Sequence, residues 1–271
     1  MTSAPQIFGI LNITSDSFSD GGKYLDPTAA LAHGRQLVAD GAHVLDIGPA
    51  SSHPDSAPVS AAEEIKRLQA VVPVLQCEGT VVSVDTFQTE TQRWALSQNV
   101  AYLNDIQGFA DQSFYRELAD ASPKLIVMHS IQGRGPATRA APPPGSMVDH
   151  VTRFFDERFG ALEAAGVARD RLILDPGMGF FLGSQPEPSL EVIRGLGTLK
   201  KRFDLPVLVS VSRKSFLRKL TGADVGGAAA ATLAAELFVA SAGADMIRTH
   251  EPRQLVDSLA VWGHLAPPGG R

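Results

Sequence analysis

Eight short apolar runs recur at fairly even intervals along this chain, with amphipathic segments between them. Short apolar runs are typical of buried strands, and amphipathic segments are typical of helices packed on one face. An alternation of strand and helix predicts an α/β fold with a parallel sheet. The runs span residues 7–13, 43–49, 81–86, 101–106, 124–130, 171–177, 206–212 and 245–250.

The number of repeats favours a closed sheet. No Pro/Gly-rich linker divides the 271 residues, and this length is near the roughly 250 residues of a (β/α)8 TIM barrel. We therefore predict a single barrel domain over residues 1–271. A doubly wound open sheet is the alternative, because the pattern alone does not show closure. Two segments rich in Gly, Ser, Pro or Asp, 14–26 and 131–146, are predicted to be long loops.

The composition argues against several classes of protein. A net charge of −5 disfavours nucleic-acid binding, which needs a basic surface. No apolar run approaches the roughly 20 residues of a membrane span. The single cysteine, Cys77, cannot form an internal disulfide, which fits a reducing cytoplasm. We expect a cytoplasmic protein whose anionic ligands, if any, are held by local clusters of cations.

Polar side chains gather at the carboxyl end of every predicted strand, whereas the amino ends carry nothing comparable. In a barrel these ends converge on the face where such enzymes place their chemistry. Arg213 and Lys214 have no carboxylate within eight residues, so we expect other strands to supply their partners. For any single Asp or Asn, a helix cap or turn former is the alternative. The side chains are Asn12, Asp46, Asp85, Asn104, Asp105, His129, Asp175, Ser212, Arg213, Lys214, Arg248 and His250.

One subset of these residues suits a planar ligand. Asp85, Asn104 and Asp175 can accept and donate hydrogen bonds in a plane, which suits a heterocycle bearing an amino group and ring N–H groups. Lys214 would meet a ring carbonyl or ring nitrogen of the same heterocycle. We expect this subset to hold a flat, donor-rich ring.

A second subset suits an anion. Asn12, Arg248 and His250 offer oxygen and cationic groups fitted to a phosphate or pyrophosphate with a bound metal. His250 alone could instead be a core or capping histidine, and His129 could simply close its strand. The histidines His33, His150 and His264 fall in predicted helices and are expected at the surface without partners.

Seven segments, in order and across nearly the whole chain, resemble the signature motifs of dihydropteroate synthase. They read GILNITSDSFSDGG, LDIG, SVDT, LNDIQGF, LILDPGMGF, SVSRKSF and IRTHE. Seven spaced motifs make a far more specific match than one glycine loop. The resemblance implies a (β/α)8 barrel, a homodimer, and a transferase that joins 6-hydroxymethyl-7,8-dihydropterin diphosphate to p-aminobenzoate, releasing pyrophosphate in folate biosynthesis.

The resemblance also implies roles for residues at the matching positions. It places Asp85, Asp175 and Lys214 in catalysis. It implies a pterin pocket of Asp85, Asn104, Ile106, Met128, Asp175 and Lys214, and a p-aminobenzoate site of Ser52, Pro54, Phe180, Phe181 and Ser212. It implies a pyrophosphate site of Asn12, His53, Arg248 and His250, with Asn12 as the ligand of Mg²⁺. Loops 14–26 and 49–59 correspond to segments that close over the substrates.

Two departures from the usual family pattern stand out. The second loop, usually G-G-E-S-T-R-P, here reads GPASSHP, so that Ala50, Ser52 and His53 replace an acid, a threonine and an arginine. The run GMGFFLGSQPEPS adds Phe181 and Leu182 beside the aminobenzoate position. These departures resemble those of the acquired, sulfonamide-insensitive branch of the family, although drift in tolerant loops could also produce them. We expect Phe181, or Phe180 beside it, to exclude sulfonamides by crowding.

The alternatives of function are a methyltetrahydrofolate-dependent methyltransferase, which shares a pterin-binding barrel, and a non-catalytic pterin-binding or interaction protein. Neither needs the anion subset of Asn12, Arg248 and His250. No Ser–His–Asp or Cys–His arrangement in the sequence suggests covalent catalysis.

Overall fold

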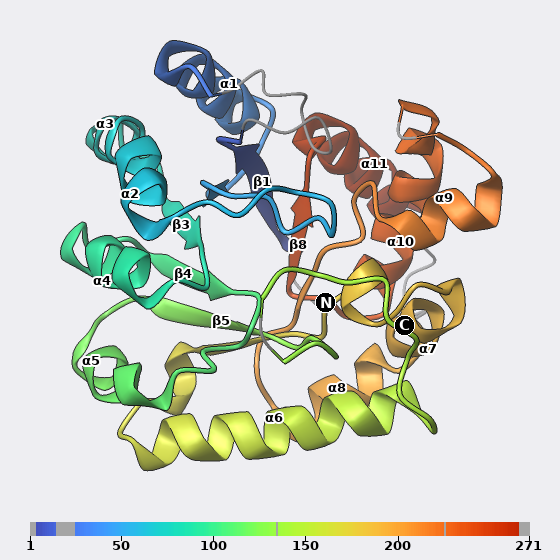
Figure 1. Cartoon of the computed structure of the whole chain (residues 1–271). Coiled ribbons are helices and arrows are strands. Elements are labelled where there is room, and N and C mark those ends of the chain that lie inside the picture. Colours follow the sequence, from blue (N-terminus) through green and yellow to red (C-terminus); the bar gives the residue numbers. More distant parts are fainter. Residues whose placement is uncertain (1–3, 15–24, 134, 225, 266–271) are drawn as a thin grey trace.

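A computed structural model of the chain describes residues 4–14, 25–133, 135–224 and 226–265 (Figure 1). Its centre is an eight-stranded sheet in the order β6-β5-β4-β3-β2-β1-β8-β7, and all strand pairs are parallel. An isolated bridge between Leu174 and Val207 joins β6 to the segment that leads into β7. The sheet therefore returns on itself as a nearly closed (β/α)8 TIM barrel, as predicted, rather than an open doubly wound sheet.

Each predicted apolar run coincides with one strand, and β1 begins one residue before its run. The β7 strand is much shorter than its run. A turn follows it, in which Arg213 has a φ of 56° and the Lys214 N–H donates to the Val211 carbonyl. The strands are β1 Gln6–Asn12, β2 Val44–Gly48, β3 Val82–Asp85, β4 Tyr102–Asp105, β5 Lys124–Met128, β6 Leu172–Asp175, β7 Leu208–Val209 and β8 Met246–Thr249.

The helices surround the sheet, and local sequence sets their starts. Asp26, Ser60 and Ser146 cap α1, α2 and α6 by accepting a backbone N–H of the first turn. The amphipathic stretch 60–75 forms two helices, the second with a proline in its first turn. The helices are α1 Pro27–Ala39, α2 Ala61–Gln69, α3 Val72–Cys77, α4 Thr89–Ser97, α5 Tyr115–Asp120, α6 Met147–Ala164, α7 Pro186–Arg194, α8 Leu196–Phe203, α9 Ser215–Thr221, α10 Ala229–Ser241 and α11 Pro252–Leu265, with 3₁₀ turns η1 Gln112–Phe114, η2 Arg169–Arg171, η3 Gly179–Phe181 and η4 Gly226–Ala228.

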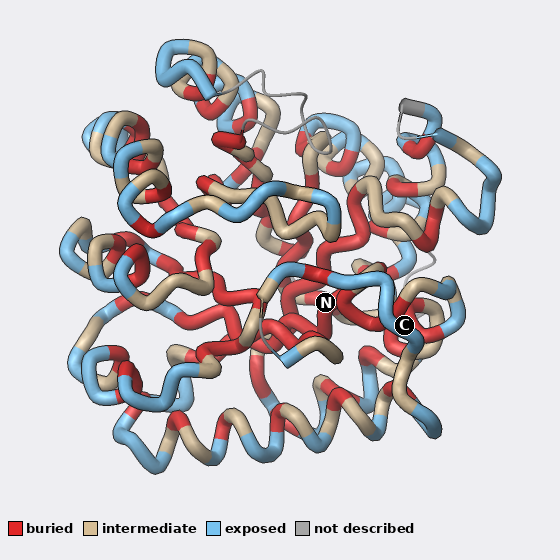
Figure 2. Tube along the Cα trace, viewed as in Figure 1, coloured by how far each residue is buried: buried red, intermediate tan, exposed pale blue. Residues whose placement is uncertain are grey.

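The barrel interior is layered, because every second side chain of a strand faces inward. An apolar layer fills the interior with Phe8, Val44, Tyr102, Ile126, Ile173, Leu208 and Met246. Two residues further along the same strands the layer becomes largely polar, with Asp46, Asn104, Met128, Asp175, Ser210 and Arg248. Figure 2 shows this buried centre enclosed by helices with exposed outer faces. The apolar layer thus closes the barrel beneath a polar site.

Two loops cross in front of the strands at this end, one after β2 and one after β5 (Figure 1). They include most of the predicted loops 49–59 and 131–146. The first predicted loop, 14–26, lies almost entirely outside the described residues. In the described part of the chain, no helix has the length and apolar character needed to cross a membrane.

Candidate active site

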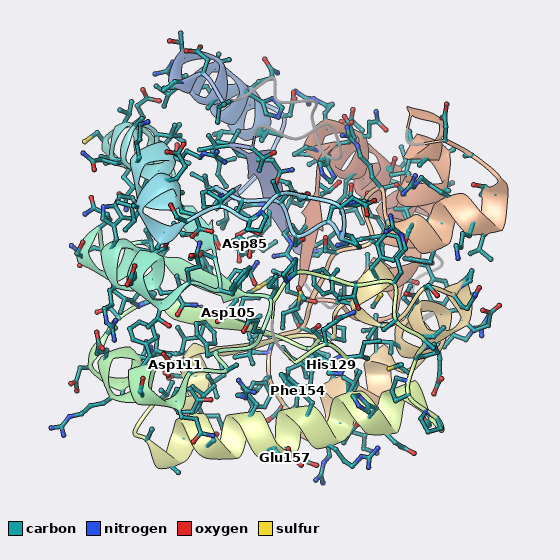
Figure 3. The ribbon with its side chains drawn as sticks, viewed as in Figure 1. Asp85, Asp105, Asp111, His129, Phe154 and Glu157 are labelled. Carbon is teal, nitrogen blue, oxygen red and sulfur yellow. The ribbon has the colours of Figure 1, made fainter. Side chains whose placement is uncertain are left out.

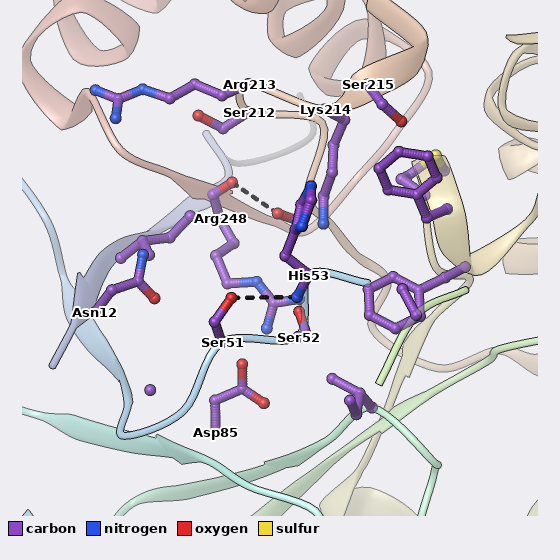
Figure 4. Close-up of a pocket in the computed structure, with 18 of the residues that line it drawn as sticks. Asn12, Ser51, Ser52, His53, Asp85, Ser212, Arg213, Lys214, Ser215 and Arg248 are labelled. Atoms are coloured by element: carbon purple, nitrogen blue, oxygen red, sulfur yellow. Dashed lines mark hydrogen bonds between the residues drawn. The ribbon is translucent and has the colours of Figure 1, made fainter. Parts of the chain in front are cut away.

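A cavity of about 480 Å³ opens at the carboxyl ends of the strands. Of the residues predicted for the site, all but Asn104 and Asp175 line it, and these two are buried within the polar layer. We call Asp46, Asp85, Asn104, Asp175, Lys214 and Arg248 the floor of the cavity. We call residues 51–55, Arg139, Phe180 and Arg218 its rim. Figure 4 shows Asp85, Lys214 and Arg248 converging from different elements.

The centre of the floor is Arg248, from β8. One terminal nitrogen lies 2.9 Å from Asp46 Oδ2 and the other lies 2.8 Å from Asp175 Oδ2, and all three side chains are buried. The other oxygen of Asp175 accepts the Gly177 N–H at 2.9 Å. The two carboxylates raise the pKa of Arg248 against the effect of its burial. The guanidinium therefore stays charged and fixed between β2 and β6.

The pKa values of Asp85 and Lys214 are both shifted to about 8. Burial, followed by the nearby charge of Asp46, raises the pKa of Asp85 to about 8. Burial, followed by the charge of Arg248, lowers the pKa of Lys214 to about 8. At pH 7 the free protein therefore holds most of Asp85 as the neutral acid and most of Lys214 as the ammonium.

Two oxygens of the floor lack hydrogen bonds. Asp46 Oδ1 and Asn104 Oδ1 are buried without a partner among the described residues, while Asn104 donates to Asp46 Oδ2 at 3.5 Å. An unsatisfied buried acceptor costs roughly 1–3 kcal/mol. The floor is thus a set of acceptors arranged for a ligand that brings donors.

An apolar cluster adjoins the floor. It consists of Ile106, Met128, Ala137 and Phe181, and Lys214 Nζ lies 5.4 Å from the centre of the Phe181 ring. Phe181 is 4% exposed. It therefore belongs to the same cluster as the two predicted apolar pterin residues, whereas its neighbour Phe180 is half-buried and packs against this cluster.

Phe180 belongs to the rim. Its ring meets His53 edge to face at 5.8 Å between centroids, and the Arg139 guanidinium lies 5.8 Å from its centre. Arg139 makes a two-pronged ion pair with Asp55, and the Ala137 N–H donates to the Ser52 carbonyl at 3.1 Å. The loops after β2 and β5 are thereby joined across the mouth, beside an aromatic wall.

His250 and Ser212 form a pair at the ends of β8 and β7. The Ser212 hydroxyl lies 2.8 Å from His250 Nδ1, and the His250 backbone N–H donates to Ser212 Oγ at 3.2 Å. Burial and the cations Arg213 and Lys214 lower the pKa of His250 well below its ordinary value. His250 is therefore neutral at pH 7 and serves as a hydrogen-bonding group.

The adjacent cations do find partners from other elements, as expected. Arg213 pairs with Glu251, which follows β8, at 2.5 Å, and its backbone N–H donates to the Thr232 hydroxyl of α10 at 3.1 Å. Lys214 turns to the other side, toward Asp85 and Asp175. The turn after β7 thus directs Arg213 toward Glu251 and α10, and Lys214 toward the floor of the cavity.

Two residues of the strand-end set have structural roles. Asp105 accepts the Gln107 N–H at 2.6 Å and the Gln92 amide at 2.8 Å, away from the cavity, which confirms the turn-former alternative for this position. His129 is fully buried, and its Nδ1 lies 3.2 Å from the Pro176 carbonyl, so Nδ1 must carry the proton. Figure 3 labels Asp85, Asp105 and His129 at the ends of β3, β4 and β5.

The expectation that His33 and His150 lack partners is wrong. His33 interacts electrostatically with His250. His150 Nδ1 lies 3.1 Å from His129 Nε2, which can only accept once His129 Nδ1 donates. Burial and His150 lower the pKa of His129 to about 3, so this histidine stays neutral and supports the Asp175–Pro176–Gly177 turn. The helical position of His150 concealed the contact, because it depends on how α6 packs against the end of β5.

The sequence analysis placed Asp46 among the polar strand ends but in neither ligand subset, and its spacing from Val44 could have assigned it to the inward face. Three other charged residues of the cavity were missed. Arg139 and Asp55 lie in loops, and Arg218 lies in α9, where no periodicity marks them. Their contribution depends on tertiary contacts that link segments far apart in the sequence.

The described residues include no group of three or more His, Cys, Asp or Glu side chains arranged to hold a metal ion. Asn12 ends β1 beside Gly48 of β2, where a side chain would reach 3.4 Å from Asn12 Oδ1. A single neutral oxygen of this kind suits Mg²⁺ that brings most of its own ligands.

Comparisons with known proteins agree with this geometry. The family model described as pterin binding enzyme matches residues 8–250. The chain is 60% identical over 259 residues to dihydropteroate synthase type-2 of Escherichia coli, covering 96% of this chain and 95% of that protein. It is 50% identical to the type-3 enzyme of the same organism, with coverage of 94% and 97%. The structure of Xanthomonas albilineans dihydropteroate synthase with 4-aminobenzoic acid matches with a TM-score of 0.88 at 34% identity, covering 98% of this chain and 95% of that one.

Proposed function

The chain belongs to the dihydropteroate synthase family of pterin-binding enzymes, and from this premise we propose how its own residues perform the reaction. The substrates are 6-hydroxymethyl-7,8-dihydropterin diphosphate and p-aminobenzoate, and the products are 7,8-dihydropteroate and pyrophosphate. One observation carries the assignment. A buried floor of unsatisfied acceptors lies in the same cavity as an aromatic rim and the anion subset of Asn12, Arg248 and His250.

The floor binds the pterin. Asp85, Asn104 and Asp175 accept hydrogen bonds from its amino and ring N–H groups, and Lys214 donates to a ring acceptor. Ile106 and Met128 pack against the ring beside Phe181. Arg248 contributes its charge at the floor while Asp46 and Asp175 keep it in place.

The reaction breaks the bond between the pterin methylene carbon and the diphosphate oxygen, and the electron pair leaves with pyrophosphate. The cation that remains is shared with the electron-rich dihydropterin ring, and the carboxylates of Asp85 and Asp175 favour it. The amine of p-aminobenzoate then attacks the methylene carbon, and the proton that it loses passes to the released pyrophosphate or to water. An aryl amine is already nucleophilic, so the site needs no strong general base.

Mg²⁺ fits the donor set as an ion that arrives with the diphosphate. Asn12 would supply the one protein oxygen, and the bound ion would neutralise charge on the leaving group. Arg248, neutral His250 and His53 lie at the same cavity to contact the diphosphate oxygens. His53 supplies less charge than the arginine usual in the family at this position.

The aminobenzoate slot lies at the rim, between Ser52, Pro54, Phe180 and Ser212. We assign sulfonamide insensitivity to Phe180 rather than Phe181, because Phe181 is buried within the apolar cluster, whereas Phe180 is half-buried and also contacts His53 and Arg139. A sulfonamide carries a tetrahedral sulfonyl and a further substituent where the substrate has a flat carboxylate. A wall of Phe180, His53 and Arg139 would clash with that substituent.

We extend the proposal to the assembly and its setting. The whole chain acts as one catalytic domain, in a reducing cytoplasm that suits the single exposed Cys77. A homodimer forms through the C-terminal helices, because α10 and α11 pack together and expose Phe238, Val261, Trp262 and Leu265. Sedimentation velocity of the wild type and Trp262→Glu tests this: the variant should be monomeric, and a monomeric wild type would contradict it.

Pyrophosphate release by the purified protein tests the function. We expect release with dihydropterin diphosphate, p-aminobenzoate and Mg²⁺, continuing at sulfonamide concentrations that stop a sensitive enzyme of the family. A methyltransferase or a non-catalytic pterin-binding barrel would release none. Either result separates the candidates, because only the synthase reaction needs the anion subset.

A further inference from the structure

Five cationic side chains line the cavity, and four of them already face carboxylates. Arg248 lies between Asp46 and Asp175, and Lys214 lies near Asp85 and Asp175. Arg139 pairs with Asp55, and Arg213 pairs with Glu251. The fifth is Arg218, for which the described residues provide no hydrogen-bond or ion-pair partner.

The position of Arg218 makes the lack of a partner energetically unfavourable. Its Nε is buried without a hydrogen bond, while the residue as a whole is only half-buried and lines the cavity. A buried donor without a partner costs roughly 1–3 kcal/mol, and more when it is charged. Because Arg218 lines the cavity, its donors are available to hydrogen-bond a ligand there.

Neighbouring groups indicate where that ligand lies. Arg218 stands three residues after Ser215 on α9, so both side chains lie on one face of the helix, and both line the cavity. The helix packs against η3, which carries Phe180 and Phe181. Ser215 Oγ would lie 3.4 Å from a side chain at Gly179, the first residue of η3. Arg218 therefore reaches the cavity on the Phe180 side, in the part assigned to the arylamine.

We propose that Arg218 is a binding and specificity residue that receives the carboxylate of the arylamine substrate. Within the proposed function, it selects a planar anion at the far end of the aromatic ring. The Nε–H and one terminal N–H of a guanidinium form a fork that matches the two oxygens of a carboxylate. A sulfonyl group presents its oxygens tetrahedrally and without a full negative charge on them, so it matches the fork poorly.

Arg218 adds an attractive contact to the discrimination that Phe180 provides by crowding. The substrate gains a charge-assisted contact that the inhibitor lacks, and the inhibitor meets a clash that the substrate avoids. Interfaces that are selective commonly combine both.

The test compares two arylamines that share a ring and an amine, p-aminobenzoate and the neutral p-aminobenzamide. Their kcat/KM values are measured by pyrophosphate release for the wild type, Arg218→Gln and Arg218→Lys. Arg194→Gln, the same change on the exposed end of α7 and outside the cavity, is the matched control. The preference for the carboxylate should fall at least about tenfold in Arg218→Gln, because the Michaelis constant for p-aminobenzoate rises.

The other variants sharpen the result. Arg218→Lys should recover part of the preference because it restores the charge without the fork, and Arg194→Gln should match the wild type. An unchanged preference in Arg218→Gln overturns the proposal, even if both rates fall together, because a structural role affects both arylamines alike. If the wild type releases no pyrophosphate, the proposed function fails, and the same ratio is then read from dissociation constants of the two arylamines with 6-hydroxymethylpterin and pyrophosphate present.

Discussion

The floor and the rim of the cavity use charge in opposite ways. In the floor, Arg248 is buried and held by two carboxylates from strands on either side. In the rim, Arg139 and Asp55 are joined in an ion pair that is about half exposed, and Arg218 has no partner among the described residues. A fully buried charge must be compensated by other groups of the protein. A charge near solvent keeps part of its hydration, so it can stay unpaired until a ligand binds.

This difference indicates a division of work. The strands fix the floor, so the pterin site that we propose there is rigid, and each of its charges affects the others. Loops and one short helix form the rim, so the arylamine site that we propose there can change without disturbing the fold. We expect substitutions in the floor to affect turnover and stability together, and substitutions in the rim to affect selectivity.

The largest expected effect is on turnover in the floor. Asp85→Ala removes an acceptor and a charge at the ring and should lower the rate of pyrophosphate release by at least about 10³-fold. The circular dichroism spectrum should not change, because Asp85 lines the cavity rather than the apolar core. The exposed Asp120→Ala on α5 is the control and should keep full activity. Near-normal turnover in Asp85→Ala would remove Asp85 from the site.

The second expected effect is on stability. Arg248→Met leaves Asp46 and Asp175 buried without their cation, which should lower the free energy of unfolding by about 3–5 kcal/mol at pH 7. The matched change in the rim, Arg139→Met, should leave the denaturation midpoint nearly unchanged because that ion pair is exposed. Equal losses in the two variants would show that the distinction between floor and rim is mistaken.

The third effect is the pH dependence of pterin binding. The free protein protonates Asp85 below about pH 8, and a donor-rich ring needs the carboxylate, so affinity should rise about tenfold per pH unit toward 8. Lys214 loses its proton above about pH 8, so affinity should fall beyond that point. Calorimetry with 6-hydroxymethylpterin should show a maximum near pH 8. In Asp85→Asn the rise in affinity below pH 8 should disappear, and in Lys214→Met the fall in affinity above pH 8 should disappear. If either variant keeps its limb of the pH profile, that limb belongs to another titrating group.

The fourth effect compares two neighbouring aromatic residues. Phe180→Ala opens the rim and should tighten sulfonamide inhibition at least about tenfold, or 1.4 kcal/mol, with a smaller change in the Michaelis constant for p-aminobenzoate. Phe181→Ala leaves a cavity in the apolar cluster and should instead cost about 3 kcal/mol of stability. Sulfonamide inhibition constants and urea denaturation, measured for both variants, test these two expectations. If Phe180→Ala weakens substrate and inhibitor equally, Phe180 is a general binding element.

The smallest effect concerns metal. In our proposal Asn12 supplies only one ligand, so Mg²⁺ without substrate should leave the melting temperature nearly unchanged, although a chelator should stop turnover. Differential scanning fluorimetry with and without Mg²⁺ tests this. A rise of many degrees without substrate would show that the chain holds the ion itself.

Much of the floor could be predicted from the sequence because strand periodicity determines it. Once eight parallel strands are recognised, the polar residues at their carboxyl ends must meet, and Asp85 and Lys214 follow. The same alternation places Asp46 beside Asn104, two positions beyond Val44 and Tyr102. Closure of the barrel was harder to predict, because one bridge between Leu174 and Val207 joins β6 to the segment before β7.

The rim could be predicted only in part. The resemblance indicated Ser52, His53 and Phe180, but the pairing of Arg139 with Asp55 joins loops 84 residues apart without a local signal. The contact between His129 and His150 likewise depends on helix packing. Which of two adjacent phenylalanines faces the rim depends on the backbone of η3, and no composition rule distinguishes them.

The separation of floor and rim is tested most directly by the affinity for 6-hydroxymethylpterin, measured by calorimetry in two variants. Asp46→Asn removes one of the two carboxylate charges that pair with Arg248, and it should weaken pterin binding at least about tenfold. Phe180→Ala should leave it within about twofold of the wild type. If the Phe180 variant loses as much pterin affinity as the Asp46 variant, the two regions form one coupled site and the account is wrong.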